Sequence, residues 1–266
     1  MIKLLSANLY RLFHSLLYWV ICLLIPVYNI GSFLSNQSLY PEHDFVALRE
    51  NSILFNHLGC IGFIAALTAG LLIGDEFESG TLRCKMVSGH TRNSIYLSYF
   101  LMILVGMLVI HVVSIGASLV VELIFYDVTM EGIREFLVCL AFSIVPIACF
   151  SAIVLLCICL SQKKALGTVI SVTAVILMSF PAGQLQWYIF YSPQLISQGA
   201  LTRKQLDTYL ILERIFPDGF SNQLINDIGY LSRGYFTGLP APLTCGILTM
   251  IFLIIGMVWF EDTDLK

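Results

Sequence analysis

Six of the 31 Asp, Glu, Lys and Arg residues of this chain lie in one short stretch, GDEFESGTLRCKMVSGHTR, which runs from Gly74 to Arg92. The stretch holds three carboxylates, three Lys or Arg side chains and one His between two long apolar runs. Glycines bracket its acidic part as they do in a phosphate-binding loop. However, no Lys precedes Thr81, and the three acids would repel a triphosphate. The chain is therefore not expected to bind ATP itself.

The sequence contains no other catalytic pattern and no metal-binding pattern. It has no Gly-x-Ser-x-Gly, no His-Glu-x-x-His and no paired acids inside an apolar run. Its eight cysteines include no Cys-x-x-Cys pair and no Cys/His spacing typical of a zinc site. No catalytic residue, metal or cofactor is expected, and the chain is not predicted to be an enzyme.

The elements that must position the charged stretch are apolar and long. The chain is 58% hydrophobic and only 12% charged, whereas soluble domains carry about 25% charged residues. Six runs without Asp, Glu, Lys or Arg are each at least 24 residues long, and about 20 apolar residues cross a bilayer. The sequence predicts an all-α, polytopic integral membrane protein, one domain over 1–266. Its six transmembrane helices are expected at about 15–34, 53–74, 94–122, 137–160, 165–186 and 239–260.

The positions of Lys and Arg predict that both termini are cytoplasmic. With this orientation the inside segments hold Lys3, Arg11, Arg83, Lys85, Arg92, Lys163, Lys164 and Lys266. The short outside loops hold only Arg49 and Arg134, while Arg203, Lys204, Arg214 and Arg233 fall in a long outer loop, 187–238. Long loops carry little weight in this rule.

Two segments outside the spans are expected to be helical. Residues 2–17 place leucines at three- and four-residue spacing, which suits an amphipathic N-terminal helix in the headgroup region. The alternative is a simple extension of the first span. In the outer loop, Thr202 and Gln205 match a capping box at the start of a helix that Pro217 would stop. We expect this loop to form short helices on or in the outer leaflet.

The charged stretch is itself expected to form a cytoplasmic elbow over 75–93, between the second and third spans. Gly80 permits a sharp turn, and 81–87 can form a short helix. Gly89 suits a left-handed cap at its end, and Thr91 suits the N-cap of the next helix. The alternative is a solvated loop with snorkelling charges.

A polar stripe on the third span is the second candidate site. His111, Ser118 and Glu122 fall within about 40° of one another on a helix, so they could line a cavity or an interface. Alternatively, Glu122 reaches the outer interface and His111 bonds a local carbonyl. His57, near the outer end of the second span, is expected to be interfacial.

The elbow sequence resembles the first cytoplasmic loop of bacterial permeases of the type-two ABC-transporter (ABC-2-like) class. The similarity lies in a Glu, an aromatic, Gly-Thr, two basic residues, Gly, Arg and Ile-Tyr. The matching residues are Glu76, Phe77, Gly80, Thr81, Arg83, Lys85, Gly89, Arg92, Ile95 and Tyr96. The six-span layout is similar too, whereas Phe220 departs from a Gln that the family carries after a Pro-small-Gly element.

The resemblance implies a permease subunit that is energised by two copies of a separate, cytoplasmic ATP-binding subunit. It also implies a second permease subunit, identical or homologous. In such proteins the elbow contacts the ATPase, and Glu76 is the best candidate for a polar contact there or with the following helix. The coupling residues expected are Glu76, Glu78, Gly80, Thr81, Arg83, Lys85, Gly89 and Arg92.

The function expected from this resemblance is ATP-driven export of a hydrophobic or amphipathic substrate. Small permeases of this kind are similar to those for antimicrobial-peptide export or lantibiotic immunity, located in a bacterial plasma membrane. Lipid is an expected partner and nucleic acid is not. One alternative is an immunity or scaffold protein that binds a peptide without pumping. Another is an ATP-independent carrier or channel, although no charged, broken-helix site is evident at mid-membrane.

Overall fold

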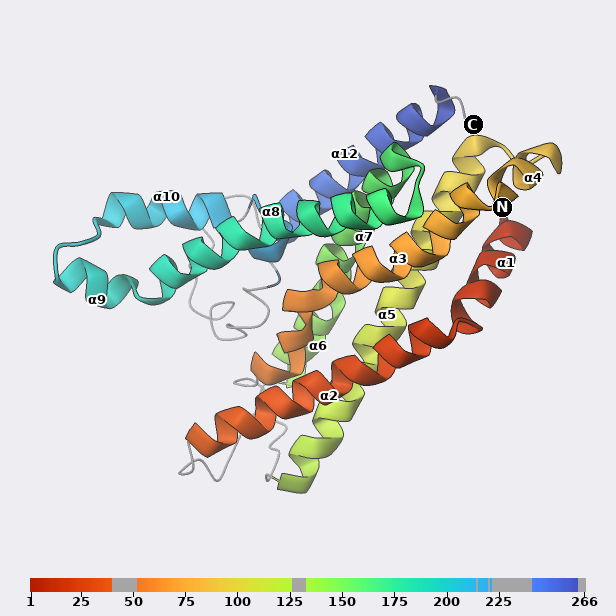
Figure 1. Cartoon of the computed structure of the whole chain (residues 1–266). Helices are drawn as coiled ribbons and strands as arrows, with labels where there is room; N and C mark the ends of the chain where they lie inside the picture. Colours follow the sequence, from red (N-terminus) through yellow and green to blue (C-terminus); the bar gives the residue numbers. More distant parts are fainter. Residues whose placement is uncertain (40–51, 126–132, 214, 220, 222–240, 263–266) are drawn as a thin grey trace.

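The computed structural model describes residues 1–39, 52–125, 133–213, 215–219, 221 and 241–262, and the regular structure in this part is helical (Figure 1). In chain order the helices are α1 (Ile2–Phe13), α2 (Leu16–Leu39), η2 (Ser52–Cys60), α3 (Ile61–Glu78), α4 (Thr81–Val87), α5 (Arg92–Phe125), α6 (Ile133–Phe142), α7 (Ile144–Ser161), α8 (Lys164–Phe190), α9 (Ser192–Ser197), α10 (Arg203–Glu213) and α12 (Ala241–Asp262).

Five helical segments are long and apolar enough to cross a membrane by themselves. They are Leu54–Glu78, Arg92–Val121, Phe136–Ser161, Lys164–Ile189 and Pro242–Asp262. A sixth is reached if α1 and α2, which are bent by 65° between Phe13 and Leu16, count as one span. The described part therefore confirms an all-helical protein with five to six apolar spans.

Several boundaries differ from those expected, for physical reasons. The second span was expected to end near Gly74, but α3 continues to Glu78 because its acidic side chains find partners on other helices. The start of that span, Ser52–Cys60, is a 3-10 helix. The fourth span is the continuous helical segment Phe136–Ser161, in which Ser143 stands between α6 and α7 and donates its N–H to Cys139 O at 2.9 Å. α8 runs to Phe190, beyond the expected end at 186.

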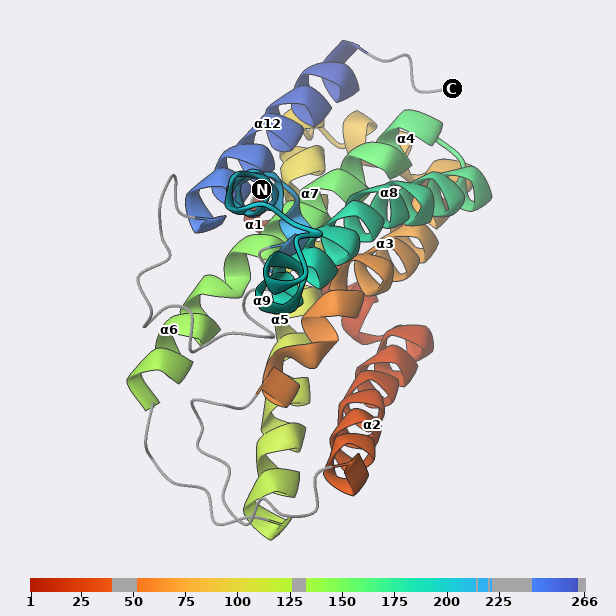
Figure 2. The same cartoon turned by 90° about the vertical axis from the view of Figure 1, so that its left-hand side faces the viewer.

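The core of the bundle forms around α7, which lies between α8 and α12 (Figure 2) and also packs on α3 and α5. Almost every side chain from Pro146 to Cys159 is buried. A helix that is apolar all round and lacks a polar face is stable only when it is enclosed. The central position of α7 follows from that composition.

Small residues allow α3 and α8 to pack closely within the chain. A Cβ atom placed on Gly70 would lie 2.2 Å from Thr168 Oγ1, and one on Gly74 would lie 2.7 Å from Lys164 Cα. Lipid-embedded helices commonly associate through such positions. Gly70 and Gly74 of the second span therefore form a contact within the chain.

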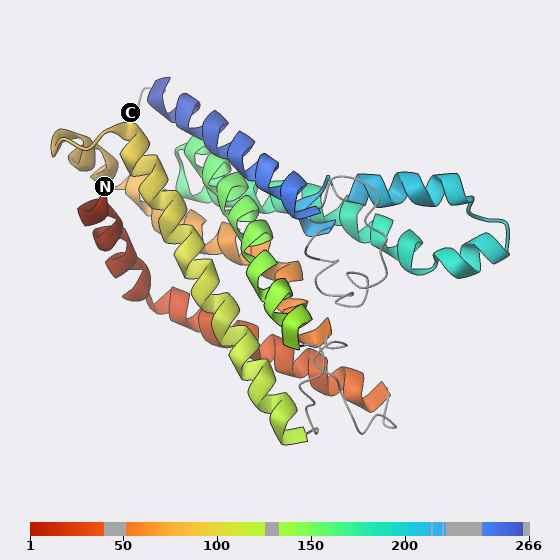
Figure 3. The same cartoon turned by 180° about the vertical axis from the view of Figure 1, so that it is seen from behind.

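The two ends of the bundle are occupied by different short helices. α1, α4 and the C-terminal end of α12 lie together (Figure 1), at what we call the elbow end. At the other side of the molecule, α9 and α10 fold back so that α10 lies along α8 (Figure 3). The expected capping box is confirmed, because Thr202 N–H donates to Gln205 Oε1 at 2.9 Å and Gln205 N–H donates to Thr202 Oγ1 at 3.4 Å. The rest of the outer loop, 222–238, lies outside the described residues.

Candidate functional site

The elbow has the backbone shape that its sequence predicts. Gly80 has φ +70° between α3 and α4, and Gly89 has φ +88° between α4 and α5, both in the left-handed region that favours glycine. Thr91 Oγ1 accepts a hydrogen bond from Ser94 N–H at 3.3 Å and caps α5. The short helix 81–87 is confirmed as α4, and its Leu82 side chain is buried against the bundle.

Glu76, at the end of α3, is almost fully buried, with a side chain only 3% exposed. Its Oε1 accepts a charge-assisted hydrogen bond from Arg11 Nη1 on α1. Its Oε2 accepts from Lys85 Nζ on α4, at 2.5 Å, and from the Tyr99 hydroxyl on α5. A buried carboxylate is tolerated when it is paired and hydrogen-bonded in this way. One side chain therefore joins four helices.

Lys85 extends the same cluster to α1. Its Nζ also donates to Asn8 Oδ1 at 2.8 Å, and Asn8 Nδ2 in turn donates to Ser98 Oγ at 2.9 Å. Burial of the ammonium, and secondly the charge of Arg11, lowers the pKa of Lys85 to about 8. The Glu76 carboxylate in contact with it acts in the opposite direction. We call the set Asn8, Arg11, Glu76, Lys85, Ser98 and Tyr99 the ionic centre.

The other two acids of the elbow contact the beginning of α8. Lys164 Nζ lies 2.6 Å from Asp75 Oδ1, and the backbone N–H of Lys164 donates to Glu78 Oε1 at 3.1 Å. The first N–H groups of a helix lack intrahelical partners and carry a partial positive charge. Glu78, expected to couple to an ATPase, thus supplies a capping carboxylate to α8.

Arg92 contacts the C-terminal end of another helix, α12. Its Nη1 donates to Glu261 O at 2.8 Å and to Phe260 O at 3.4 Å, in the last turn of α12. A cation is favourable there because the final carbonyls of a helix are unpaired and partly negative. Asn93 Nδ2 adds a hydrogen bond to Glu261 Oε2 at 3.3 Å. The elbow is thereby tied to α12 as well as to α1, α3, α5 and α8.

One side of α4 is left facing away from the bundle. We call Arg83, Cys84, Val87 and Ser88 the exposed face of α4, since all four are exposed and lie at i, i+1, i+4 and i+5. Val87 is 88% exposed, which is high for a β-branched apolar residue. Of the eight residues expected to couple, Glu78, Thr81, Arg83 and Gly89 are exposed, whereas Glu76 is buried and Lys85 is half-buried.

The second candidate site lies at the far end of the bundle, away from the elbow. His111 Nδ1 is 2.7 Å from His57 Nε2, and His111 Nε2 is 2.7 Å from Ser143 Oγ. Asn29 Nδ2 lies 3.1 Å from His57 Nδ1 and 3.5 Å from Ser118 Oγ. His111 thus contacts side chains of other segments, in place of the local carbonyl that the alternative gave it, and the His57 side chain is buried inside the bundle.

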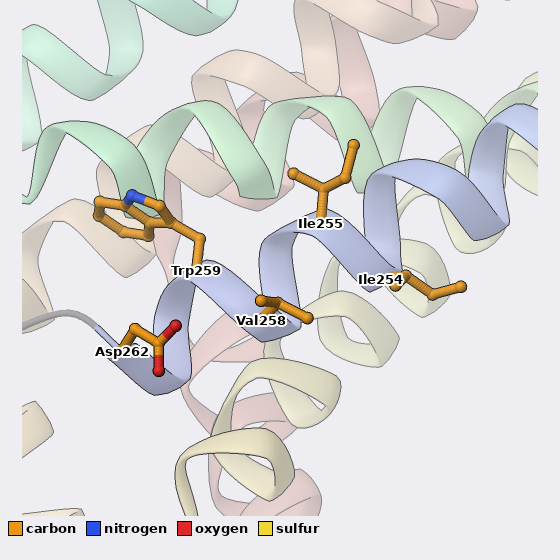
Figure 4. Close-up of a pocket in the computed structure, with 5 residues that line it drawn as sticks. All are labelled: Ile254, Ile255, Val258, Trp259 and Asp262. Atoms are coloured by element: carbon orange, nitrogen blue, oxygen red, sulfur yellow. The ribbon is translucent and has the colours of Figure 1, made fainter.

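Glu122, the third member of the expected stripe, has a side chain outside the described part of the structure. An open hollow on the surface of α12, shown in Figure 4, is lined by Ile254, Ile255, Val258, Trp259 and Asp262. All five lie on one helix, and four of them are apolar. None of the expected site residues lines this hollow, which has the character of a lipid-facing surface.

Four of the six residues of the ionic centre were not identified from the sequence as site residues. Asn8, Ser98 and Tyr99 carry no motif, and Arg11 was counted only for topology. One signal was available: Leu4, Asn8 and Leu12 form the buried stripe of α1, so a polar Asn stands on an apolar helix face. Asn29 and Ser143 of the far-end cluster were likewise missed, although polar residues in a span are candidates by rule.

The fold and this site define a class: a multi-pass, all-helical membrane protein with a buried ionic centre where its spans meet a charged elbow. Comparison of the chain with protein families makes the assignment specific. The sequence model of the ABC-2 family transporter proteins matches residues 4–265, nearly the whole chain, and the chain belongs to that family. It is an ABC transporter permease, a transport component of the membrane. No curated protein matches the sequence.

Proposed function

We propose that this permease is driven by a separate ATP-binding subunit that docks on the exposed face of α4 on the cytoplasmic side. The observation that carries the proposal is the combination of a solvent-facing α4 with a buried ionic centre directly behind it. Lys85 and Leu82 fix α4 to the bundle. Arg83 and Val87 remain available to a partner.

The charged residues of the elbow fall into two groups, those with partners inside the chain and those exposed to a partner protein. Glu76, Asp75 and Glu78 are occupied by partners within the chain, so they transmit a displacement of α4 to the spans. The direct contact with the ATPase then belongs to Arg83 and Val87. A basic side chain beside an exposed apolar one fits a partner surface with an apolar groove and an acidic rim.

Several finer features of the proposal come from family likeness. We propose two ATP-binding subunits and a second permease subunit, identical or homologous, in a bacterial plasma membrane. The cargo proposed is a hydrophobic or amphipathic molecule moved outward, with an antimicrobial peptide as the leading candidate. Exposed apolar side chains along α8 and α12, such as Phe180 and Val258, would allow such a molecule to approach from lipid.

The alternatives predict different behaviour of the same chain. An immunity or scaffold protein would bind a peptide without any ATP-linked partner. An ATP-independent carrier or channel would transport without one. Neither alternative gives a reason for an exposed apolar and basic face directly over a buried ionic centre.

Co-expression with candidate ATPases, followed by purification and transport assays in vesicles, tests the proposal. Arg83→Glu combined with Val87→Asp should abolish co-purification of the ATPase and ATP-dependent transport, while leaving thermal stability unchanged. Lys204→Glu, an exposed charge reversal on α10, is the matched control and should retain both. Full co-purification of an ATPase with the double variant would refute the assignment of the docking face.

A further inference from the structure

The buried polar cluster at the far end of the bundle includes a residue from a 3-10 stretch of one span. His57 belongs to the 3-10 segment η2 that precedes α3. Ser143 stands between α6 and α7, within the helical segment Phe136–Ser161. A stretch of 3-10 helix inside a longer helical segment often marks a functional hinge. α5, which carries His111, passes unbroken between His57 and Ser143.

The cluster is a continuous chain of hydrogen bonds. With the Asn29 amide nitrogen as donor, His57 Nδ1 accepts and the proton of this ring lies on Nε2. In that arrangement His57 Nε2–H donates to His111 Nδ1, and His111 Nε2–H donates to Ser143 Oγ. Ser143 completes the chain by donating to Leu140 O at 2.7 Å. This arrangement satisfies every contact of the chain with two neutral rings.

The four hydrogen-bonded residues come from four different segments of the protein. Asn29 comes from α2, His57 from η2, His111 from α5 and Ser143 from the α6–α7 junction. The four residues are 0–1% exposed. In a low-dielectric surrounding such bonds are strong, but they are also all-or-none because each ring must donate on one side and accept on the other.

Two buried polar atoms beside the chain have no hydrogen-bond partner among the described residues. They are Asn29 Oδ1 and Ser114 Oγ. Ser114 lies on the same face of α5 as His111 and Ser118, at i+3 and i−4 respectively. These two atoms would gain partners if the far end opened to water, whereas the chain itself would lose its bonds. Opening would therefore exchange the hydrogen bonds of this cluster for contacts with water.

We propose that His111 is a positioning residue that holds the far end of the permease closed through its hydrogen bonds to His57 and Ser143. Transport then requires these hydrogen bonds to break. This inference rests on the proposed function, because it assumes a transport cycle. α5 is the connecting element: Tyr99 in the ionic centre and His111 are 12 residues apart, about 18 Å along one straight helix. A displacement of the elbow therefore reaches the chain along α5.

The test measures opening at Ser114→Cys by its rate of reaction with a maleimide in nanodiscs, read by peptide mass spectrometry. With His111 intact the thiol should be protected, because Ser114 is fully buried. His111→Phe keeps an aromatic ring but removes both hydrogen bonds, and should raise the labelling rate about tenfold, the effect of losing roughly one net buried hydrogen bond. His111→Gln can both donate and accept, and should restore protection.

A second variant keeps the test decisive if His111→Phe does not fold. Ser143→Ala removes only the last link and should also increase labelling. Protection that is equal in the wild type, His111→Phe and Ser143→Ala would overturn the inference. So would equal labelling of His111→Phe and His111→Gln, which would indicate a packing role alone.

Adding the ATP-binding subunit separates this inference from the proposed function. ATP should increase labelling of Ser114→Cys in the assembled complex with His111 intact, and an unchanged rate in an actively transporting complex would overturn the role of the chain. Failure to obtain any ATPase partner would instead contradict the proposed function. The labelling pattern of the isolated permease would still be readable in that case.

Discussion

At the scale of single residues, the cost of burying Glu76 is met by groups from three other helices. Removing a carboxylate-sized ion from water is unfavourable by several kcal/mol unless its partners have good geometry. Glu76 has two cations and a hydroxyl, and the Asn8 amide holds one of those cations from behind. The side chain is therefore expected to dominate the stability of the elbow end.

Replacing Glu76 should destabilise the protein far more than replacing its exposed partner. Glu76→Ala leaves the half-buried Lys85 without its counter-charge, and we expect a loss of about 3 kcal/mol or more, which lowers Tm by about 6–12 °C. Arg11→Ala removes a side chain that is 43% exposed, so less than about 1 kcal/mol is expected. Thermal unfolding in detergent measures both, and equal effects of the two variants would contradict the ionic centre.

Titration of Lys85 should make stability depend on pH in an alkaline window. Its pKa is about 8 in the folded protein against 10.5 for the free side chain, so the unfolded chain binds more protons between these values. Stability should therefore rise with pH from about 8 to 10. Lys85→Arg, which stays charged throughout, should lack this rise. A Tm difference between the two proteins that stays constant from pH 7.5 to 10 would argue against the assigned shift.

At the scale of elements, local signals and distant contacts differ in what a sequence can predict. Gly80, Gly89 and the Thr91 cap are determined by neighbouring residues, so the shape of the elbow was predictable and is confirmed. The contact of Glu76 with the following helix was expected and is confirmed by Lys85 on α4. Its pairing with Arg11 was not expected, because Arg11 is 65 residues away and belongs to a helix whose orientation depends on packing. Expected ends of spans failed for the same reason: α3 continues where remote cations neutralise its acids.

The internal contact between α3 and α8 should be sensitive to a single added methyl group. Gly74→Ala would force Cβ against the backbone of Lys164, and we expect a loss of about 1–3 kcal/mol. Gly116→Ala on α5 is the matched control: no neighbour lies within 4 Å of the added Cβ, so the greater helix propensity of Ala should leave stability unchanged or improved. Similar Tm values for the two variants would contradict the close packing of α8 against Gly74 of α3.

At the scale of the whole molecule, the elbow works as the junction of the bundle. Its charged residues reach α1, α5, α8 and α12, so few spans could move independently of α4. α5 continues from this junction to the chain around His111 at the far end. A permease that receives its energy from another polypeptide needs such a connection between a docking surface and the spans. The family membership of the chain and this geometry both support the proposal that a separate subunit drives the permease through the elbow.

The most direct test is photo-crosslinking from position 87 in the assembled complex. A benzoylphenylalanine in place of Val87 should crosslink to the ATP-binding subunit, because Val87 is 88% exposed on the face proposed to dock. The same probe at Leu16, which is 81% exposed on α2, should give no such product. The account predicts a crosslink at 87 alone. A co-purifying, active ATPase that never crosslinks to position 87 would contradict it.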